Sequence, residues 1–213
     1  LADLGMPSQT PAREPRIAAP WSGPTMIAWL TCAVLVLGSL QRGGAPPDAQ
    51  QVAAAVAEIE RGLASPKATE SAAAIKKHAS LADPRVVAVV AKALKDARAD
   101  VRLEALDGLG RNAHADALAA LASYYDAEKK TLRKDERALP QLLVAVARHG
   151  QPRAIAILTD DVQAQLKPKT ITARILGLAN IRANESVAAL FTLMDKLGFL
   201  EQNTHAEDFR LAL

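Results

Sequence analysis

Apolar residues recur at helical spacing from residue 48 onward. Val101, Ala105 and Leu109 fall at i, i+4 and i+8, which places them on one face of an α-helix. No stretch of the body alternates apolar and polar residues between hairpin turns, as strands do. The pattern therefore predicts an all-α body.

The same periodicity divides the body into helix pairs. Ser65-Pro66 and Asp83-Pro84 each place a capping side chain before a first-turn proline. Asp100 is predicted to cap a further helix, and Asn184 precedes another. The predicted helices cover residues 48–64 with 66–79, 84–96 with 101–110, 115–130 with 136–148, and 152–165 with 169–180, followed by a helix that starts near 185.

A small residue recurs near the end of each second helix, at Ala79, Gly110, Ala147 and Ala179, in steps of 31, 37 and 32 residues. One helix pair cannot bury its apolar face alone, so neighbouring pairs are expected to stack. We expect the small residues at 110, 147 and 179 to lie where a larger side chain would collide with the adjoining helix. The longer step indicates an insertion within one repeat.

The sequences ADVRLEALDGLG at 99–110 and DPRVV at 83–87 resemble the HEAT-like repeats of the bilin-lyase subtype. The resemblance covers about residues 48–198, although the copies around 136–165 lack the D-x-x-V-R start and carry Pro140. It implies an α-α superhelix, a solenoid of the HEAT/armadillo type with about four to five helix pairs. By analogy of fold alone, it also implies a non-enzymatic protein-interaction scaffold.

Composition excludes several classes of protein and of functional site. Of 213 residues, 50% are hydrophobic and 3% aromatic, which is too apolar for a disordered chain. The single cysteine excludes an intrachain disulfide framework and a cysteine-based metal site, and the four histidines are scattered. No nucleotide-binding or hydrolase motif is present. We expect no catalytic residue, no cofactor and no metal. The alanine- and arginine-rich composition hints at a bacterial source.

Three segments precede the body. Residues 1–25 are basic and proline-rich, residues 26–40 form an uncharged apolar run, and residues 41–47 read as a linker. The run has 15 residues, which suits a signal peptide better than a membrane span of about 20. We expect a periplasmic or secreted protein, or one anchored by an uncleaved N-terminal segment. A hydrophobic helix docked on the body is the remaining alternative.

Candidate partner contacts lie on the second helices and beside the insertion. Arg102, Glu104 and Arg174 are expected to be exposed on a concave surface. Consecutive helical residues point about 100° apart, so Tyr124 and Tyr125 cannot both face the core of one helix. One of them is a candidate interface anchor, with partial burial beneath the insertion as the alternative.

Charge weighs against other partners. The densest basic run, within 129–137, is interleaved with acids and reads as a solvated helix end and loop, and Asp160-Asp161 reads as an exposed pair. Nearly balanced charge disfavours a nucleic-acid-binding solenoid, and few aromatic residues disfavour a bilin-lyase-like enzyme.

Membrane contact is expected through 26–40 only. A capping box at Thr204–Glu207 close to the last residue suggests that the repeat body, 48–213, is incomplete at its C-terminus.

Overall fold

The computed structural model describes residues 47–162, 167–197 and 212. Within them nine helices follow one another and no strand occurs, which confirms the all-α prediction for this part of the chain. Some predictions lie outside the described residues: those for 1–25, 26–40, 204–207 and all but the last residue of 41–47. The helices are α2 (Ala49–Ala64), α3 (Ala68–His78), α4 (Pro84–Ala93), α5 (Ala99–Arg111), α6 (Ala115–Leu132), α7 (Ala138–Arg148), α8 (Ala154–Thr159), α9 (Pro168–Ala179) and α10 (Asn184–Lys196).

Local sequence explains where several helices begin. Asp83 caps α4 as predicted, since its carboxylate accepts from the Arg85 backbone N–H at 2.8 Å. Asp135 caps α7 in the same way through two backbone N–H groups. The expected cap at Asp100 is wrong, because α5 begins at Ala99 and places this acid in its first turn. An acid there still meets the positive end of the helix dipole.

One predicted helix is much shorter than expected. The helix predicted at 152–165 is α8, which ends at Thr159. Asp160 is extended, and Asp161 has a φ of 53° in the left-handed region, so the helix cannot continue through them. Their carboxylates pair with Lys129 and Arg133 of α6.

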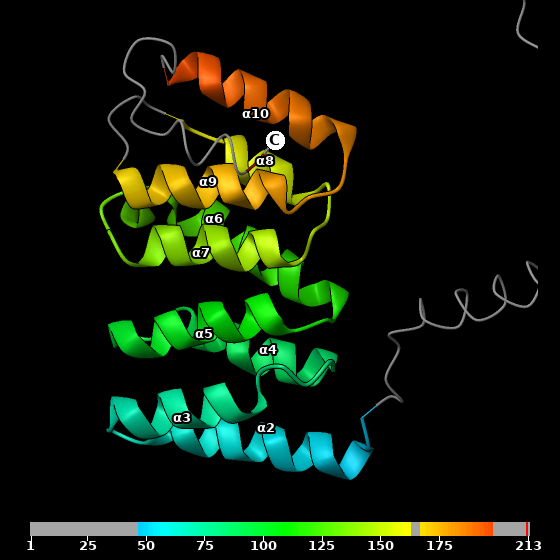
Figure 1. The fold of residues 1–213 in the computed structure, drawn as a ribbon. Helices are drawn as coiled ribbons and strands as arrows, with labels where there is room; N and C mark the ends of the chain where they lie inside the picture. The colour runs from blue at the N-terminus through cyan, green and yellow to red at the C-terminus, as the bar shows by residue number, and fades with distance from the viewer. Residues whose placement is uncertain (1–46, 163–166, 198–211, 213) are drawn as a thin grey trace, which may run out of the picture. The chain divides into compact units, whose positions relative to one another are not determined.

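The helices alternate between two layers. In Figure 1, α3, α5, α7 and α9 lie one above another in the nearer layer, with α4, α6 and α8 behind them. Each nearer helix packs on the next one of its layer and on the farther helix that precedes it in the chain. The apolar core lies between the layers and includes Ile59, Ile75, Leu109, Leu121 and Leu143, all fully buried. Burying each such side chain contributes about 1.5–3 kcal/mol.

Small residues bring the nearer helices into close contact. A Cβ atom added to Gly108 of α5 would lie 2.5 Å from the Ala79 Cβ beside α3. One added to Gly110 would lie 2.7 Å from the Ala145 Cα of α7, which confirms that position 110 must be small. We call these positions, with the next pair along the layer, the small-residue seam: Ala79, Gly108, Gly110, Ala145, Ala147 and Gly177.

The last contact of the seam differs from the prediction. Ala147 of α7 faces Gly177 of α9, where an added Cβ would lie 3.0 Å from the Ala147 Cβ and 3.0 Å from a Leu158 methyl group. Ala179, the predicted position, is only half-buried. The contact falls two residues earlier because Gly177, not Ala179, lies on the face of α9 that meets α7.

Side chains at the helix ends join neighbouring helices a second time. The residue that follows α5, α7 and α9 in each case contacts a carbonyl oxygen near the end of the preceding nearer helix, where helix carbonyls lack intrahelical partners. The contacts join Asn112 Nδ2 to Ala79 O (2.6 Å), His149 Nε2 to Leu109 O (3.2 Å) and Asn180 Nδ2 to Ala147 O (2.8 Å). Since a carbonyl only accepts, the imidazole donates from a protonated Nε2.

Substitution of the seam glycines tests the close packing. Gly108→Ala is expected to destabilise the fold by about 1–3 kcal/mol, although alanine normally favours a helix. Adding Ala79→Gly removes the colliding Cβ, leaves the Ala79 Cα at 3.9 Å and should restore most of the loss. Ala145→Gly should not rescue Gly110→Ala, because the Ala145 Cα itself lies at 2.7 Å. Urea unfolding of the four variants measures this, and equal rescue in both pairs would contradict it.

His149 gives the fold a dependence on pH. Burial lowers the pKa of His149 below 6.5, against an opposing effect of its bond to the Leu109 carbonyl. The unfolded chain therefore binds the proton more readily, so stability is fully present above about pH 6.5 and falls as the pH drops towards the lowered pKa. His149→Gln, which keeps a donor without the titration, should flatten the curve of unfolding free energy between pH 7 and 5. An unchanged slope would contradict the assignment.

Candidate interaction groove

An open groove follows α7 and α9 on the nearer face. Its volume is about 810 Å³, and its walls repeat at helical spacing along both helices. Val144 and Leu176 line it and are 36% and 43% exposed, although both are large and apolar. Ala147, Ala173 and Gly177 also line it, and their small size leaves space between the two walls. The seam therefore also shapes this groove.

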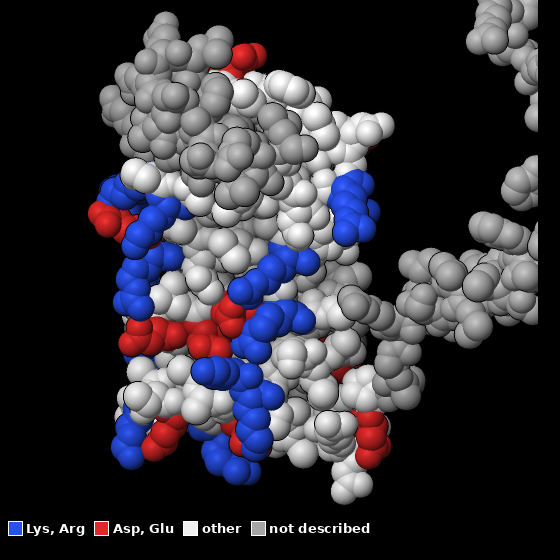
Figure 2. Space-filling model, in the orientation of Figure 1, with Lys and Arg blue, Asp and Glu red and all other residues white. Residues whose placement is uncertain are grey.

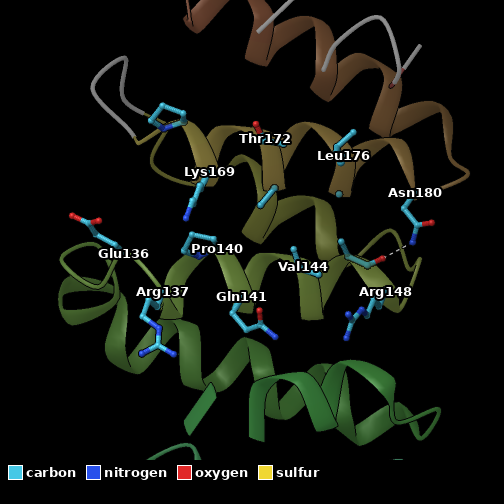
Figure 3. A pocket seen from close by; sticks show the side chains of 14 residues that line it. Glu136, Arg137, Pro140, Gln141, Val144, Arg148, Lys169, Thr172, Leu176 and Asn180 are labelled. Carbon is cyan, nitrogen blue, oxygen red and sulfur yellow. Dashed lines mark hydrogen bonds between the residues drawn. The ribbon is translucent and has the colours of Figure 1, made fainter. Parts of the chain in front are cut away.

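Basic side chains lie at the ends of the groove. In Figure 3, Lys169 and Arg137 lie near Pro140 at one end, and Arg148 lies near Asn180 at the other. Among the described residues that line the groove, Glu136 is the only acid, and it pairs with Lys167. Val144 and Leu176 lie between the ends (Figure 3). The groove thus carries basic side chains at both ends, with two large apolar side chains between them.

An acidic band adjoins the groove. Figure 2 shows this band across the nearer face at the level of α5, with basic residues on both sides. Asp107 of α5 accepts from Arg148 at 2.6 Å and from Arg111 at 2.9 Å. These pairs hold the pKa of Asp107 below its usual value, against the effect of burial, the largest single influence. Arg148 is therefore neutralised by α5, whereas Lys169 has no ion-pair partner in the described part of the chain.

Arg102 and Glu104, both predicted to contact a partner, make contacts within the chain instead. Arg102 is half-buried, and its Nη1 donates to the Asp96 and Ala97 carbonyls at 2.8 and 2.9 Å. It lines a smaller hollow of about 360 Å³ together with Tyr124, away from the groove. Glu104 is also half-buried and lies 3.4 Å from Arg111; burial, and then Asp107, raise its pKa. The expectation that Arg102 and Glu104 are fully exposed is wrong.

Both tyrosines are buried. Tyr124 is 8% exposed and Tyr125 is 2% exposed, so neither is the exposed anchor that the sequence suggested. Consecutive side chains do diverge, but α6 packs on α4 on one side and on α8 on the other, so it buries two faces. Tyr125 donates its hydroxyl to Asp160 at 3.1 Å. Burial raises the pKa of both phenols.

Arg174 is buried, which contradicts the prediction that it lies exposed on the surface. Only 1% of the residue is exposed. Its Nη1 donates to the Leu158 carbonyl at 2.6 Å and to the Ile157 carbonyl at 3.2 Å, so it closes the C-terminal end of α8. Burial lowers its pKa. Arg174 therefore holds α8 to α9 and has no surface to offer a partner.

The two adjacent acids, Asp160 and Asp161, also form ion pairs within the chain. Asp160 and Asp161 are half-buried and pair with Lys129 and Arg133, so their expected free exposure is wrong. Both bases belong to the mixed-charge run, which does form a helix end and a turn: α6 extends to Leu132 before the turn into α7. The insertion of the longer repeat step thus anchors the end of α8.

Other site types find no support in the described part of the chain. No group of three or more His, Cys, Asp or Glu side chains there is placed to hold a metal ion. No helix there has both the length and the apolar content needed to cross a bilayer. His78, at the end of α3, contacts the Glu58 carboxylate at 2.8 Å.

Sequence reasoning missed the groove. Val144 and Leu176 fit the apolar pattern of their helices and look like core residues. One signal was available, because each is followed at i+4 by a polar residue, Arg148 or Asn180, of the kind that marks a solvent-exposed face. With this geometry established, comparison adds no relative: the sequence matches no protein-family model and no curated protein.

The structural role of Arg174 has a direct test. Arg174→Ala is expected to lower the free energy of unfolding by about 2–4 kcal/mol, because it opens a cavity and leaves two carbonyls unpaired. Arg182→Ala, which removes an exposed arginine nearby, should change it by less than about 0.5 kcal/mol. Equal stability of the two variants in urea unfolding would show that Arg174 does not hold α8.

Proposed function

We propose that the helical unit is a non-enzymatic protein-interaction scaffold, a HEAT-like α-solenoid that docks a partner segment in the groove between α7 and α9. The observation that carries the proposal is the partial exposure of Val144 and Leu176 inside a groove. Large apolar side chains gathered in a hollow favour binding, because covering them releases water from apolar surface.

The packing supports this assignment. Helix pairs that contact only their neighbours present one continuous face, on which grooves between helices recur. The repeat spacing and the resemblance of 83–87 and 99–110 to HEAT-like repeats point the same way. The fold supports this function only by analogy, and the groove supplies the specific site.

Cell location is a separate part of the proposal. The length and flanks of the apolar run at 26–40 favour export, with an uncleaved anchor as the alternative. A scaffold of this kind would meet its partner outside the cytoplasm. N-terminal sequencing of the protein recovered from each cell fraction decides between cleavage and anchoring.

Two other functions are less well supported. Nucleic acid requires many phosphate contacts from an uninterrupted basic surface. The acidic band on α5 lies beside the groove and neutralises Arg148. A bilin-lyase-like enzyme requires aromatic contacts around its ligand, whereas the lining of the groove contains no aromatic residue.

Selection of binding peptides tests the groove. The full chain is immobilised, and a displayed library of random peptides is selected on it. We expect the enriched peptides to lose at least about tenfold in affinity on Leu176→Glu, because a charge replaces an apolar contact. Fluorescence anisotropy with labelled copies of these peptides measures the change.

The matched control is Val187→Glu on α10. Val187 is 46% exposed, similar to Leu176, but it lies outside the groove. Peptide affinity should be unchanged in this variant, and circular dichroism should show both variants folded. Peptides that bind Leu176→Glu as well as the parent, or a selection that enriches none, would overturn docking in the groove.

A further inference from the structure

The chemistry of the groove specifies its occupant further; this step rests on the proposed function. The lining runs along α9 from Pro168 to Asn180, about 18 Å at 1.5 Å per residue. An extended chain advances about 3.3 Å per residue, so about five of its residues fit along the groove. The site therefore suits a short segment of a partner.

The apolar contact lies at one place along this length. Val144 of α7 and Leu176 of α9 both lie nearer the Arg148 end of the groove than the Lys169 end (Figure 3). Ala147 and Gly177 also line the groove, and their small size leaves room above them for a large side chain. A leucine or phenylalanine side chain placed there would remove the most apolar surface from water.

The charge of the groove is unequal at its two ends. At the Arg148 end the guanidinium is already paired with Asp107 at 2.6 Å. At the other end Lys169 has no ion-pair partner in the described residues, and Arg137 reaches Asp100 only at 3.4 Å, with both side chains about 70% exposed. Exposed pairs of that kind are weak, so Arg137 remains available to a ligand.

We propose that the occupant is a short partner segment that carries acidic side chains beside one large apolar side chain. The apolar side chain lies against Val144 and Leu176, and the acidic side chains lie at Lys169 and Arg137. A basic segment is disfavoured at this end, where it would meet the positive charge of Lys169 and that of Arg137, which is only weakly paired. Nucleic acid is disfavoured as well, since two cations and two large apolar side chains do not follow a phosphate backbone.

Three synthetic peptides test this inference on the full chain. The first carries a central leucine with glutamates on one side, the second replaces the glutamates with lysines, and the third replaces the leucine with serine. We expect the first to bind at least about tenfold more tightly than either other, and its advantage over the second to shrink as salt rises. Lys169→Glu should abolish or reverse that preference. Lys130→Glu, an exposed charge reversal on α6, should not change it.

The outcomes distinguish a failure of this inference from a failure of the proposed function. If peptides bind in a manner that depends on Leu176 but Lys169→Glu leaves the glutamate preference intact, the acidic segment is wrong and the groove stands. If no peptide depends on Leu176, the proposed groove itself is wrong. Binding of oleate with no binding of the first peptide would overturn the inference in favour of an amphiphilic anion.

Discussion

The close approach of helix backbones in the nearer layer is the constraint on which the structure depends. Gly110 lies where a single Cβ would be 2.7 Å from the backbone of α7, so that contact admits no side chain. At such distances the helices interlock through backbone and methyl groups, and packing cannot adjust by changing rotamers. The larger side chains between the layers then fill a space whose size the seam has set.

The same constraint produces the groove. Two neighbouring helices with long side chains along their contact would close the space between them. Ala147 and Gly177 bring α7 and α9 together at depth and leave room above, so Val144 and Leu176 remain accessible. Stability and binding surface thus have one origin, and the residues that make the groove are also residues that hold the helices.

Much of the helix layout could be predicted from the sequence, because local signals determine it. Asp83-Pro84 starts a helix through one capping bond and one fixed φ angle. The need for a small residue at Gly110 is indicated by the recurrence of small residues at the ends of the second helices. Side chains that face other helices could not be placed in this way. Tyr124 and Tyr125 are both buried because α6 has neighbours on two sides. Arg174 is buried because α8 ends early, at Thr159, and the helical pattern of α9 alone does not reveal that end.

The seam also governs how such a chain can vary in length over evolution. Its contacts lie in the C-terminal halves of α5, α7 and α9, where helix ends are also joined through Asn112, His149 and Asn180. The 37-residue step is accommodated at the opposite edge, by a longer α6 and the turn before α7. One edge of the layer therefore fixes the register of the repeats, whereas the other accepts added residues. New loops can arise at that second edge, beside Arg137 and Lys169, without disturbing the helices they would adjoin.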